Sequence, residues 1–268
     1  MTRKPTLKPE RIDDREDRTP TLQRPVRSRA RAMAMDAHLA PHQHPWTQLT
    51  YCASGLMQVT IAENGLETTF IVPPSRALWI APGVQHTVTV LEAAEFRTVD
   101  LNASVTPVGW QGCRVIVVTK LLRELIHALE TSTPGPRDEA LMALTLDEIT
   151  RADIQALGVP LPRDKRLRAL CEAVLRAPGE RATLAEWAVD VGASERTVAR
   201  LFRTELSTSY QQWRQQAILA HALPMLARGT PISQVAFASG YASDSAFSAM
   251  FKAALGQPPS FFQVKNGL

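Results

Sequence analysis

The sequence predicts an α+β protein of two domains, a strand-rich N-terminal domain followed by an all-α C-terminal domain. In the first part of the chain, runs such as residues 26–33 alternate polar and apolar side chains, which is typical of strands. From residue 163 onward, apolar residues recur every three or four positions, as in amphipathic helices. The segment GVPLP at residues 158–162 cannot continue a helix, because each proline lacks an amide donor. We place the domain boundary there and expect it to act as a hinge.

Length and composition set the limits of this prediction. The chain has 268 residues, of which 45% are apolar, enough for two modest domains with separate cores. It has no apolar run near the roughly 20 residues of a membrane span, and MTRKPTLKPERIDDRED lacks a hydrophobic signal-peptide core. We therefore expect a soluble, cytoplasmic protein. Cys52, Cys113 and Cys171 are too scattered for a disulfide framework or a thiolate zinc site, and we expect them to be buried.

The net charge of +4 is unevenly distributed. Residues 1–32 and 163–268 carry an excess of Lys and Arg, whereas residues 33–162 carry an excess of Asp and Glu. The basic C-terminal part suits a surface that faces phosphate groups, and the acidic middle would be repelled by DNA.

The N-terminal domain is expected to follow a disordered tail. Residues 1–24 are polar and charge-dense and contain three prolines. The alternation at residues 26–33 then predicts a strand, with Arg27, Arg29 and Arg31 on a face that is exposed to water.

Four polar residues in this domain could converge on one site. His42, His44 and Gln48 lie on one face of an extended segment, because side chains alternate with a period of two. His86 follows a Pro-Gly turn and would arrive from another strand. Three imidazoles and a neutral amide can hold Zn, Ni, Cu or Fe. The alternative is that the histidines line an effector pocket with hydrogen-bonding groups.

Neighbouring side chains extend this candidate site. Thr50 and Cys52 continue the inward face, and Trp46, Tyr51 and Trp79 are either pocket-lining aromatic residues or core. The candidate effector-binding residues are His42, His44, Trp46, Gln48, Thr50, Trp79 and His86, and the candidate metal ligands are His42, His44, Gln48 and His86.

The spacing of these residues resembles the two sequence motifs of the cupin barrel. The motifs are HxH, an acid or amide four positions after the second His, a Gly seven positions further, and a later PG-x-x-H, and they cover about residues 40–90. The resemblance implies a cupin-like β-barrel over residues 25–115 that senses an effector. In metal-binding cupins these positions supply three imidazoles and a glutamate to one ion, so Gln48 departs from the pattern as a weaker ligand.

Two helices are predicted between this barrel and the domain boundary. Leu121, Leu122, Leu125 and Leu129 form an apolar stripe within residues 118–129. After the turn-forming TSTPGPRDE, a second pattern runs through Leu141, Leu144 and Ile149. The two helices form either an intramolecular hairpin or a surface that pairs two subunits.

The C-terminal domain begins with a helix predicted at residues 163–177, with Leu167, Leu170 and Val174 facing inward. Thr183 and Glu186 then have the spacing of a capping box and open a short helix at residues 184–191. This helix ends against a glycine, after which a second helix begins.

The second helix belongs to residues 192–206, GASERTVARLFRTEL. Ser194 is a candidate N-cap. Its apolar face consists of Val198, Leu201, Phe202 and Leu206, and the opposite face consists of Arg196, Arg200 and Arg203. The same offsets return 49 residues later at Ser243, Phe247, Met250, Phe251 and Leu255. The pattern predicts two helix-turn-helix units.

Residues 210–228 are predicted to form one long helix between the two units. At 1.5 Å per residue it would span roughly 28 Å, close to the pitch of about 34 Å that separates successive major grooves on one face of DNA. Pro224 predicts a kink or an early end, because it deletes the backbone bond to Ala220. Thr230 and Pro231 suit the N-cap and the first position of the next helix.

These features resemble the AraC/XylS family of bacterial transcription regulators. The resemblance covers about residues 165–262, and its most specific parts are SERTVARLF, ISQVAFASGYASDSAFSAMFKAALGQPPSFF and the spacing between them. It implies that residues 163–268 hold two helix-turn-helix units joined by a long helix, with promoter DNA and RNA polymerase as partners. It also implies that the helices of residues 116–162 pair two chains into a homodimer.

Both recognition helices are expected to contact DNA. The candidate residues are Arg196, Ala199, Arg200, Arg203, Asp244, Ser245, Ala249 and Lys252. Arginine can bond guanine in a bidentate manner, whereas serine and alanine offer less. We therefore expect the first helix to carry most of the sequence specificity and Lys252 to contact phosphate.

The sequence thus predicts a transcription regulator, not an enzyme, that responds to a small-molecule or metal effector bound in the cupin domain. The alternative is a metal-dependent cupin enzyme that carries a DNA-binding domain. Retention of three histidines favours this alternative, and Gln48 and the lack of an evident general base count against it.

Overall fold

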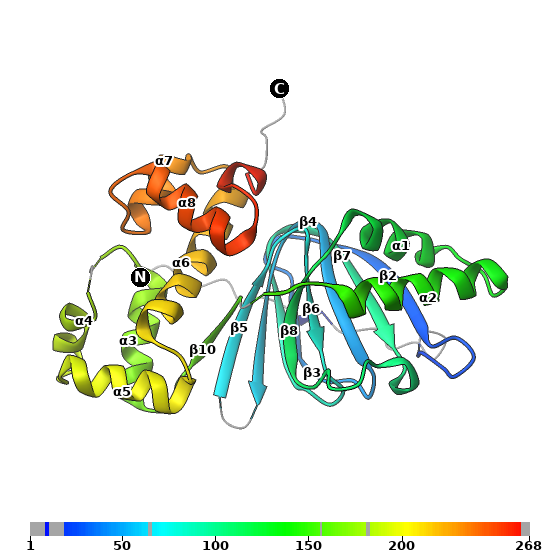
Figure 1. The fold of residues 1–268 in the computed structure, drawn as a ribbon, viewed down its shortest axis with the longest axis horizontal. Helices are drawn as coiled ribbons and strands as arrows, with labels where there is room; N and C mark the ends of the chain where they lie inside the picture. Colours follow the sequence, from blue (N-terminus) through cyan, green and yellow to red (C-terminus); the bar gives the residue numbers. More distant parts are fainter. Residues whose placement is uncertain (1–8, 11–18, 64–65, 156, 181–182, 264–268) are drawn as a thin grey trace. The chain divides into compact units, whose positions relative to one another are not determined.

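The computed structural model describes residues 9–10, 19–63, 66–155, 157–180 and 183–263 (Figure 1). The chain forms two compact units. Unit 1 comprises residues 1–61 and 72–156, and unit 2 comprises residues 62–71 and 157–268. The fold is therefore α+β, with a sheet-rich and a helical unit as the sequence predicts. Most of the predicted disordered tail, residues 1–24, lies outside the described residues, but residues 9–10 form a strand and Arg24 pairs with Asp138, so these parts of the tail are not disordered.

The sheet of unit 1 is built mainly from antiparallel strands. Its main strands are β2 (Val26–Met33), β3 (His38–His42), β4 (Thr47–Glu63), β6 (Arg76–Ile80), β7 (His86–Leu101), β8 (Cys113–Val117) and β9 (Ile154–Gln155). The order is β3-β7-β4-β6-β8-β9, and β2 also pairs with β7. The two-residue β1 (Pro9–Glu10) adds to β3 in parallel. No pairing among the described residues joins β9 to β3, so hydrogen bonds do not close the predicted barrel.

A single glycine lies at an irregularity in the longest strand. β4 runs without a break through Gly55. The register with β7 shifts between Cys52 and Met57, and Gly55 has φ +79°. A Cβ atom at Gly55 would lie 2.2 Å from the Ala93 carbonyl oxygen, so the close approach of the two strands requires glycine.

Two helices cover one face of the sheet (Figure 1), α1 (Lys120–Glu130) and α2 (Pro136–Arg151). Their buried residues share one core with Leu49, Tyr51 and Trp79 of the sheet. The Ser28 hydroxyl donates to the Ile126 carbonyl oxygen at 3.1 Å, so the even-numbered residues of β2 point toward the helices.

The odd-numbered residues of β2 therefore point to the opposite face of the sheet. There Arg29 lies 3.1 Å from the carboxylate of Asp100, which is fully buried. The expected water-exposed arginine face is thus partly wrong, since Arg27 and Arg29 are half-buried and only Arg31 is exposed. Local alternation predicts the strand correctly but cannot show which of its faces meets water.

The helix pair is predicted correctly in position, and less well in orientation. Leu122, Leu125 and Leu129 are buried as expected, but Leu121 is 52% exposed. In α2 the buried face runs through Met142, Thr145 and Ile149, and Leu144 is 50% exposed. Thr145 can face the core because its hydroxyl donates to the carbonyl oxygen of Leu141 at 2.7 Å.

Unit 2 contains all the helices that the sequence predicts after residue 163. They are α3 (Lys165–Arg176), α4 (Leu184–Asp190), α5 (Glu195–Leu206), α6 (Tyr210–Ala227), α7 (Ile232–Ala238) and α8 (Asp244–Leu255), followed by a 3-10 turn at Pro259–Phe261. The predicted capping box of Thr183 and Glu186 is present, and Ser194 and Ser243 cap α5 and α8 as expected. These helix starts are confirmed.

The observed bounds of two helices differ from the predicted ones. α6 continues three residues beyond Pro224, so the proline does not end it. Its N-terminal half, through Trp213 and Ala217, shares a core with α3, α4 and α5, which can offset one missing backbone bond. α7 begins at Ile232 with Pro231 as its N-cap, one position later than expected.

The proline-rich segment is a strand of unit 2. β10 (Gly158–Leu161) pairs antiparallel with β5 (Leu66–Val72), and Pro160 lies opposite Thr68. Val159 and Leu161 are buried with α3 and α6, and the Trp213 indole donates to the Pro160 carbonyl oxygen at 2.8 Å. A proline that cannot belong to a helix is tolerated in such a short strand.

Candidate functional site

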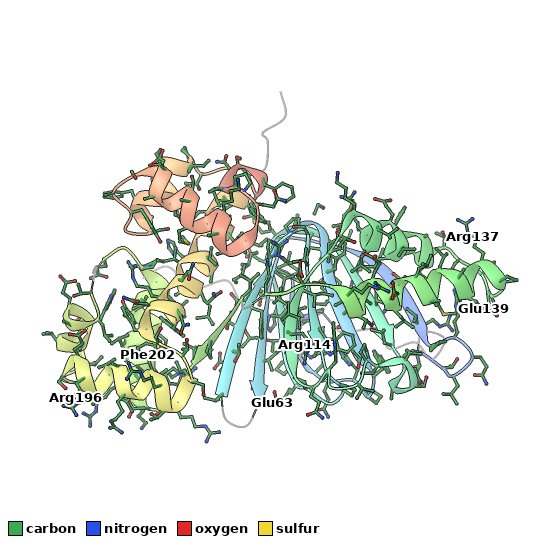
Figure 2. All side chains as sticks on the ribbon, viewed as in Figure 1. Glu63, Arg114, Arg137, Glu139, Arg196 and Phe202 are labelled. Carbon is green, nitrogen blue, oxygen red and sulfur yellow. The ribbon has the colours of Figure 1, made fainter. Side chains whose placement is uncertain are left out.

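The helix α5 presents a charged face and a buried face. Arg196, Arg200 and Arg203 are exposed, whereas Val198 and Phe202 are buried. Phe202 packs against the rings of Tyr210 and Trp213, with centroids 5.5 and 5.6 Å away. In Figure 2 Arg196 points outward from the helix, away from the side that holds Phe202. The buried face fixes the helix, and the arginine face remains available.

The helix α8 has the same construction with different chemistry. Phe247, Phe251 and Leu255 are fully buried. The predicted contact residues, which are all exposed or partly exposed, are Asp244, Ser245, Ala249 and Lys252. The hydroxyl of Ser245 lies 3.1 Å from that of the capping Ser243. One cation and one anion on this face leave it without the positive excess of α5.

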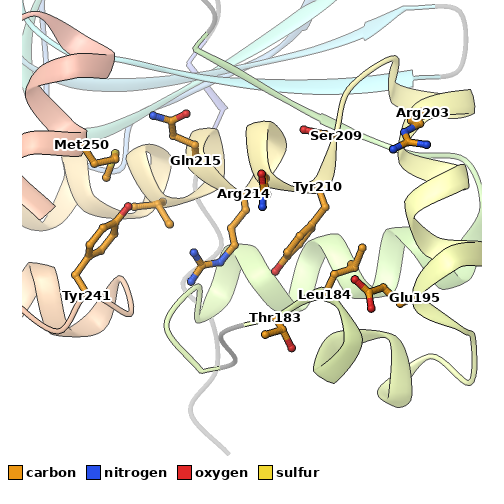
Figure 3. A pocket seen from close by; sticks show the side chains of 12 residues that line it. Thr183, Leu184, Glu195, Arg203, Ser209, Tyr210, Arg214, Gln215, Tyr241 and Met250 are labelled. Carbon is orange, nitrogen blue, oxygen red and sulfur yellow. The ribbon is translucent and has the colours of Figure 1, made fainter. Parts of the chain in front are cut away.

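A cleft of unit 2 lies beside the helices α5, α6 and α8 (Figure 3). It has a volume of about 670 Å³ and is lined by residues of α4, α5, α6 and α8, among them Glu195, Arg203, Gln215 and Met250. Ala199, the remaining predicted DNA-contact residue on α5, is only partly exposed. Both predicted recognition helices therefore border one cleft of unit 2.

In unit 1 the three predicted histidines lie together. Their ring centroids are 4.2 Å apart for His42 and His86, 5.2 Å for His44 and His86, and 6.4 Å for His42 and His44. His42 and His86 are direct partners in the register of β3 and β7, and His44 follows in the loop. His44 and His86 are buried.

Backbone carbonyl groups orient all three rings. Nδ1 of His42 lies 2.8 Å from the Ala40 oxygen, Nδ1 of His44 lies 2.7 Å from the Trp46 oxygen, and Nδ1 of His86 lies 2.9 Å from the Val84 oxygen. A carbonyl oxygen can only accept, so Nδ1 carries the proton and Nε2 carries a lone pair.

The Nε2 atoms of His44 and His86 are buried and have no hydrogen-bond partner among the described residues. Burial lowers the pKa of His86 to about 4, opposed by its bond to the Val84 carbonyl, so the ring is neutral at pH 7. The Trp46 ring stacks on His44 with centroids 5.5 Å apart, and its indole N–H is also buried without a described partner. The cluster therefore offers two buried ring nitrogens, of which that of His86 is a neutral acceptor, and one indole donor.

Two predicted members of the site are turned elsewhere. The Gln48 amide donates to Asp100 at 2.9 Å. Trp79 lies in the core beneath the helices and is fully buried, because Leu49 and Tyr51 pair with the same strand on that face. In the described part of the chain, no three His, Cys, Asp or Glu side chains are arranged to hold a metal ion. Gln48 therefore bonds to Asp100, and the metal-ligand set of His42, His44, His86 and Gln48 stays a prediction.

A buried polar network near Gln48 was not predicted from the sequence. Asp100 accepts from Gln48 and faces Arg29, and the Arg29 Nε donates to the Thr98 hydroxyl at 3.3 Å. The hydroxyl of Thr50, on the neighbouring strand opposite Thr98, is buried without a described partner. The alternation of Thr98 and Asp100 with apolar residues was the only signal that could have identified these groups.

The three cysteines differ in burial and therefore in reactivity. Cys52 and Cys171 are buried as predicted, and burial raises the pKa of the Cys52 thiol to about 12 and also raises that of Cys171, so both are unreactive. Cys113 is only half-buried, so the expectation that all three cysteines are buried is wrong for this residue.

None of the helices in the described ranges combines the length and the hydropathy that a membrane crossing requires.

Comparisons with known proteins identify a family for both parts of the chain. Residues 24–146 match the family model described as an AraC-like ligand binding domain, and residues 187–264 match a helix-turn-helix domain. The chain is 36% identical over 224 residues to the HTH-type transcriptional regulator NimR of Escherichia coli, covering 81% of this chain and 80% of NimR.

Two further similarities are more limited. The HTH-type transcriptional regulator RipA of Corynebacterium glutamicum is 32% identical over 103 residues, which cover 38% of this chain and 31% of RipA. The crystal structure of ToxT from Vibrio cholerae O395 covers 90% of this chain and 98% of its own, at 13% identity and a TM-score of 0.37. From the NimR similarity and the two matched domains, we conclude that the chain belongs to the AraC family of ligand-responsive helix-turn-helix transcription regulators.

Proposed function

We propose that this regulator binds promoter DNA through α5 and α8 and that an effector at His44 and His86 controls this binding. The observation that carries the effector site is the pair of buried Nε2 atoms without a described partner. Leaving such an acceptor unsatisfied costs about 1–3 kcal/mol. A ligand that donates hydrogen bonds to both atoms would remove this cost, which favours its binding at the histidine cluster.

The effector is an organic molecule that presents N–H or O–H groups to the two imidazoles. Donor groups are required because both nitrogens are acceptors, and the neutral His86 ring gives no charge to attract an anion. The stacked Trp46 adds an aromatic wall next to His44. A metal ion is the other species that an imidazole lone pair binds, but the described side chains do not assemble a ligand set for it.

Metal analysis of the purified full-length chain separates these two species. The sample is compared with a His42→Ala, His86→Ala double variant. Absence of stoichiometric metal, with operator DNA still bound, supports the organic effector. If the wild-type chain holds about one transition-metal ion and the double variant holds none, the effector at this site is a metal ion and not an organic molecule.

The DNA-binding face is proposed to be asymmetric. The three arginines of α5 can make bidentate bonds to guanine, each giving about 1–3 kcal/mol of base discrimination. On α8 the matching positions are Ser245, Ala249 and Lys252, and the Ser245 hydroxyl already lies against Ser243. The first recognition helix therefore supplies most of the specificity, and the second supplies mainly phosphate contacts.

Alanine variants test this asymmetry. Arg196→Ala and Arg200→Ala are each expected to weaken operator binding about 5- to 100-fold and to relax base preference, whereas Ser245→Ala changes binding little. In a salt titration, Lys252→Ala should give a shallower slope, by about one ion, with unchanged base preference. Equal losses for Arg200→Ala and Ser245→Ala would contradict the asymmetry.

A homodimer through α1 and α2 completes the proposal, with RNA polymerase as the partner of the DNA-bound dimer. Its support is the pair of exposed leucines, Leu121 on α1 and Leu144 on α2, on helices whose other faces are buried. Sedimentation of a Leu121→Glu, Leu144→Glu variant should show a monomer, and Glu124→Gln on the exposed side of α1 serves as the control. A monomeric wild-type chain would refute this part.

A further inference from the structure

The two helix-turn-helix units of unit 2 touch through their backbones. Gly179 follows α3, and Gly240 lies in the turn between α7 and α8. A Cβ atom on Gly179 would lie 2.6 Å from the Ala238 oxygen and 2.7 Å from the Gly240 nitrogen. Real Cβ atoms essentially never come within 3.0 Å of such neighbours, so this contact requires glycine. It joins the first unit to the second at a point that is not part of α6.

Arg214 of α6 closes the same junction. Its Nη2 donates to the Pro178 carbonyl oxygen at 2.9 Å. A Cβ atom on Gly240 would lie 3.2 Å from this Nη2 and 3.0 Å from the Gly179 Cα. Figure 3 shows Arg214 extending from α6 between Tyr210 and Tyr241. One guanidinium group thus contacts the loop of the first unit and borders the turn of the second.

The pKa values of two nearby tyrosines agree with the position of Arg214 at this junction. Burial raises the pKa of Tyr210 and of Tyr241, and Arg214 lowers both values in part. Tyr210 packs on Phe202 of the first unit, whereas Tyr241 packs on Phe247 of the second, with centroids 5.5 and 5.6 Å away. The positive charge of Arg214 therefore lies near one ring from each unit.

We propose that Gly179, Gly240 and Arg214 set the distance and orientation between α5 and α8, so that each chain reads two DNA segments at one spacing. The inference rests on the proposed DNA contacts of these two helices. A connection through α6 alone would let the units bend and twist, and Pro224 already removes one backbone bond from that helix. A second contact away from α6 closes a ring of contacts and removes this freedom.

Rigid spacing has a measurable consequence for DNA. One extra base pair between the two segments moves the second by about 3.4 Å and rotates it by about 35° around the DNA axis. Two fixed helices cannot follow this change, whereas two independent helices can. Spacing preference is therefore the property that distinguishes a rigid junction from a flexible one.

The test uses the full-length chain and the duplex that the wild-type chain selects from a randomised library. Phosphate-ethylation interference with Arg200→Ala and with Lys252→Ala assigns the segments that face α5 and α8. Spacer duplexes then gain or lose one base pair between these segments. The variants are Gly179→Ala, Arg214→Ala and Gly240→Ala, and the control is Gly256→Ala.

The wild-type chain is expected to lose at least about tenfold in affinity on either spacer duplex. Gly179→Ala is expected to bind the selected duplex about tenfold more weakly and to bind both spacer duplexes within about threefold of it. Arg214→Ala should show the same loss of preference. Gly256 has φ +72° and no atom within 4 Å of its Cβ position, so Gly256→Ala should keep the wild-type spacing preference. Gly240 has a similar φ of +81°, so this control also measures the cost of placing alanine in a left-handed backbone conformation, which Gly240→Ala shares.

Two results overturn the proposal. Either folded Gly179→Ala and Arg214→Ala retain the wild-type spacing preference, or the wild-type chain tolerates both spacers. If circular dichroism shows that Gly179→Ala does not fold, Arg214→Ala decides, because it removes a hydrogen bond without adding an atom. A wild-type chain that selects no sequence at all refutes the DNA contacts themselves, which is a different failure.

Discussion

The ion pair of Arg24 and Asp138 anchors the start of unit 1 to the start of α2, and its loss is predicted to destabilise this unit strongly. Arg24 Nε lies 2.9 Å from Asp138 Oδ2, and Nη2 lies 3.0 Å from Oδ1. The Asp138 side chain is 2% exposed and Arg24 is 19% exposed. Arg24 also donates to the Ser132 carbonyl oxygen at 2.7 Å, which fixes the turn between the helices.

Removing Arg24 leaves a buried carboxylate with one remaining donor. Breaking a buried pair in this way costs about 3–5 kcal/mol. The hydroxyl of Ser132 still donates to Asp138, so we place Arg24→Ala at the lower end, about 3 kcal/mol. For a unit of this size the loss corresponds to a fall in Tm of about 6–12 °C.

Hydrogen exchange measures this loss where it occurs. If α2 opens together with unit 1, its amides should exchange about 100-fold faster in Arg24→Ala. Arg151→Ala is the matched control, because its ion pair with Asp147 is exposed to solvent and its loss should leave exchange unchanged. The double variant Arg24→Met, Asp138→Leu should recover most of the stability. Exchange in Arg24→Ala that equals wild type would refute the reasoning.

Three further predictions concern single residues. The pKa of His86 in the folded chain, about 4, lies below its ordinary value of 6.5, so the folded state binds fewer protons between these values and loses up to about 3 kcal/mol as the pH falls from 6.5 to 4. Urea unfolding of His86→Gln should lack this component, and identical pH profiles for variant and wild type would contradict it. Thiol reagents at pH 8 should modify Cys113 quickly and leave Cys52 and Cys171 unmodified until the chain unfolds; mass spectrometry that finds Cys171 labelled in the folded chain would count against this. Pro224→Ala should stabilise unit 2 by about 1–2 kcal/mol in chemical denaturation, because it restores the donor that α6 lacks, and a destabilised variant would show that the ring packs favourably.

The helices of unit 2 were predictable because their signals are local. Thr183 with Glu186, Ser194 and Ser243 mark helix starts by side-chain caps that depend on residues three positions away. The buried stripes of α5 and α8 follow the helical period in the same way. Such information is contained within a few turns of sequence.

The strand β10 was not predictable for the opposite reason. Its partner β5 lies about 90 residues earlier in the chain, and nothing local distinguishes a proline-rich strand from a proline-rich linker. In α2, Asp138 and Thr145 are buried although they are polar, so a search for apolar residues alone rotated the predicted face toward Leu144. Both errors come from contacts that only the tertiary structure supplies.

The histidine cluster shows both situations. The period of two along an extended chain placed His42 and His44 on one face, and the structure brings His86 to them. The hydrogen-bond partner of Gln48 is Asp100, which lies 52 residues away in the sequence, so the residues around Gln48 do not indicate the pairing. The shared location could therefore be predicted, but the chemistry of the fourth group could not.

The pairing of β5 with β10 means that the DNA-binding unit is not one continuous piece of the chain. A protease cut after Leu161 would leave both strands on the N-terminal fragment and all helices from α3 to α8 on the other. The fragments would still share the Arg168–Glu67 ion pair at 2.7 Å, the bond from Trp213 to Pro160 and the burial of Val159 and Leu161. A nicked chain should therefore stay together in gel filtration, and a fragment that begins at residue 163 should expose an apolar groove that the intact protein fills with its own strand.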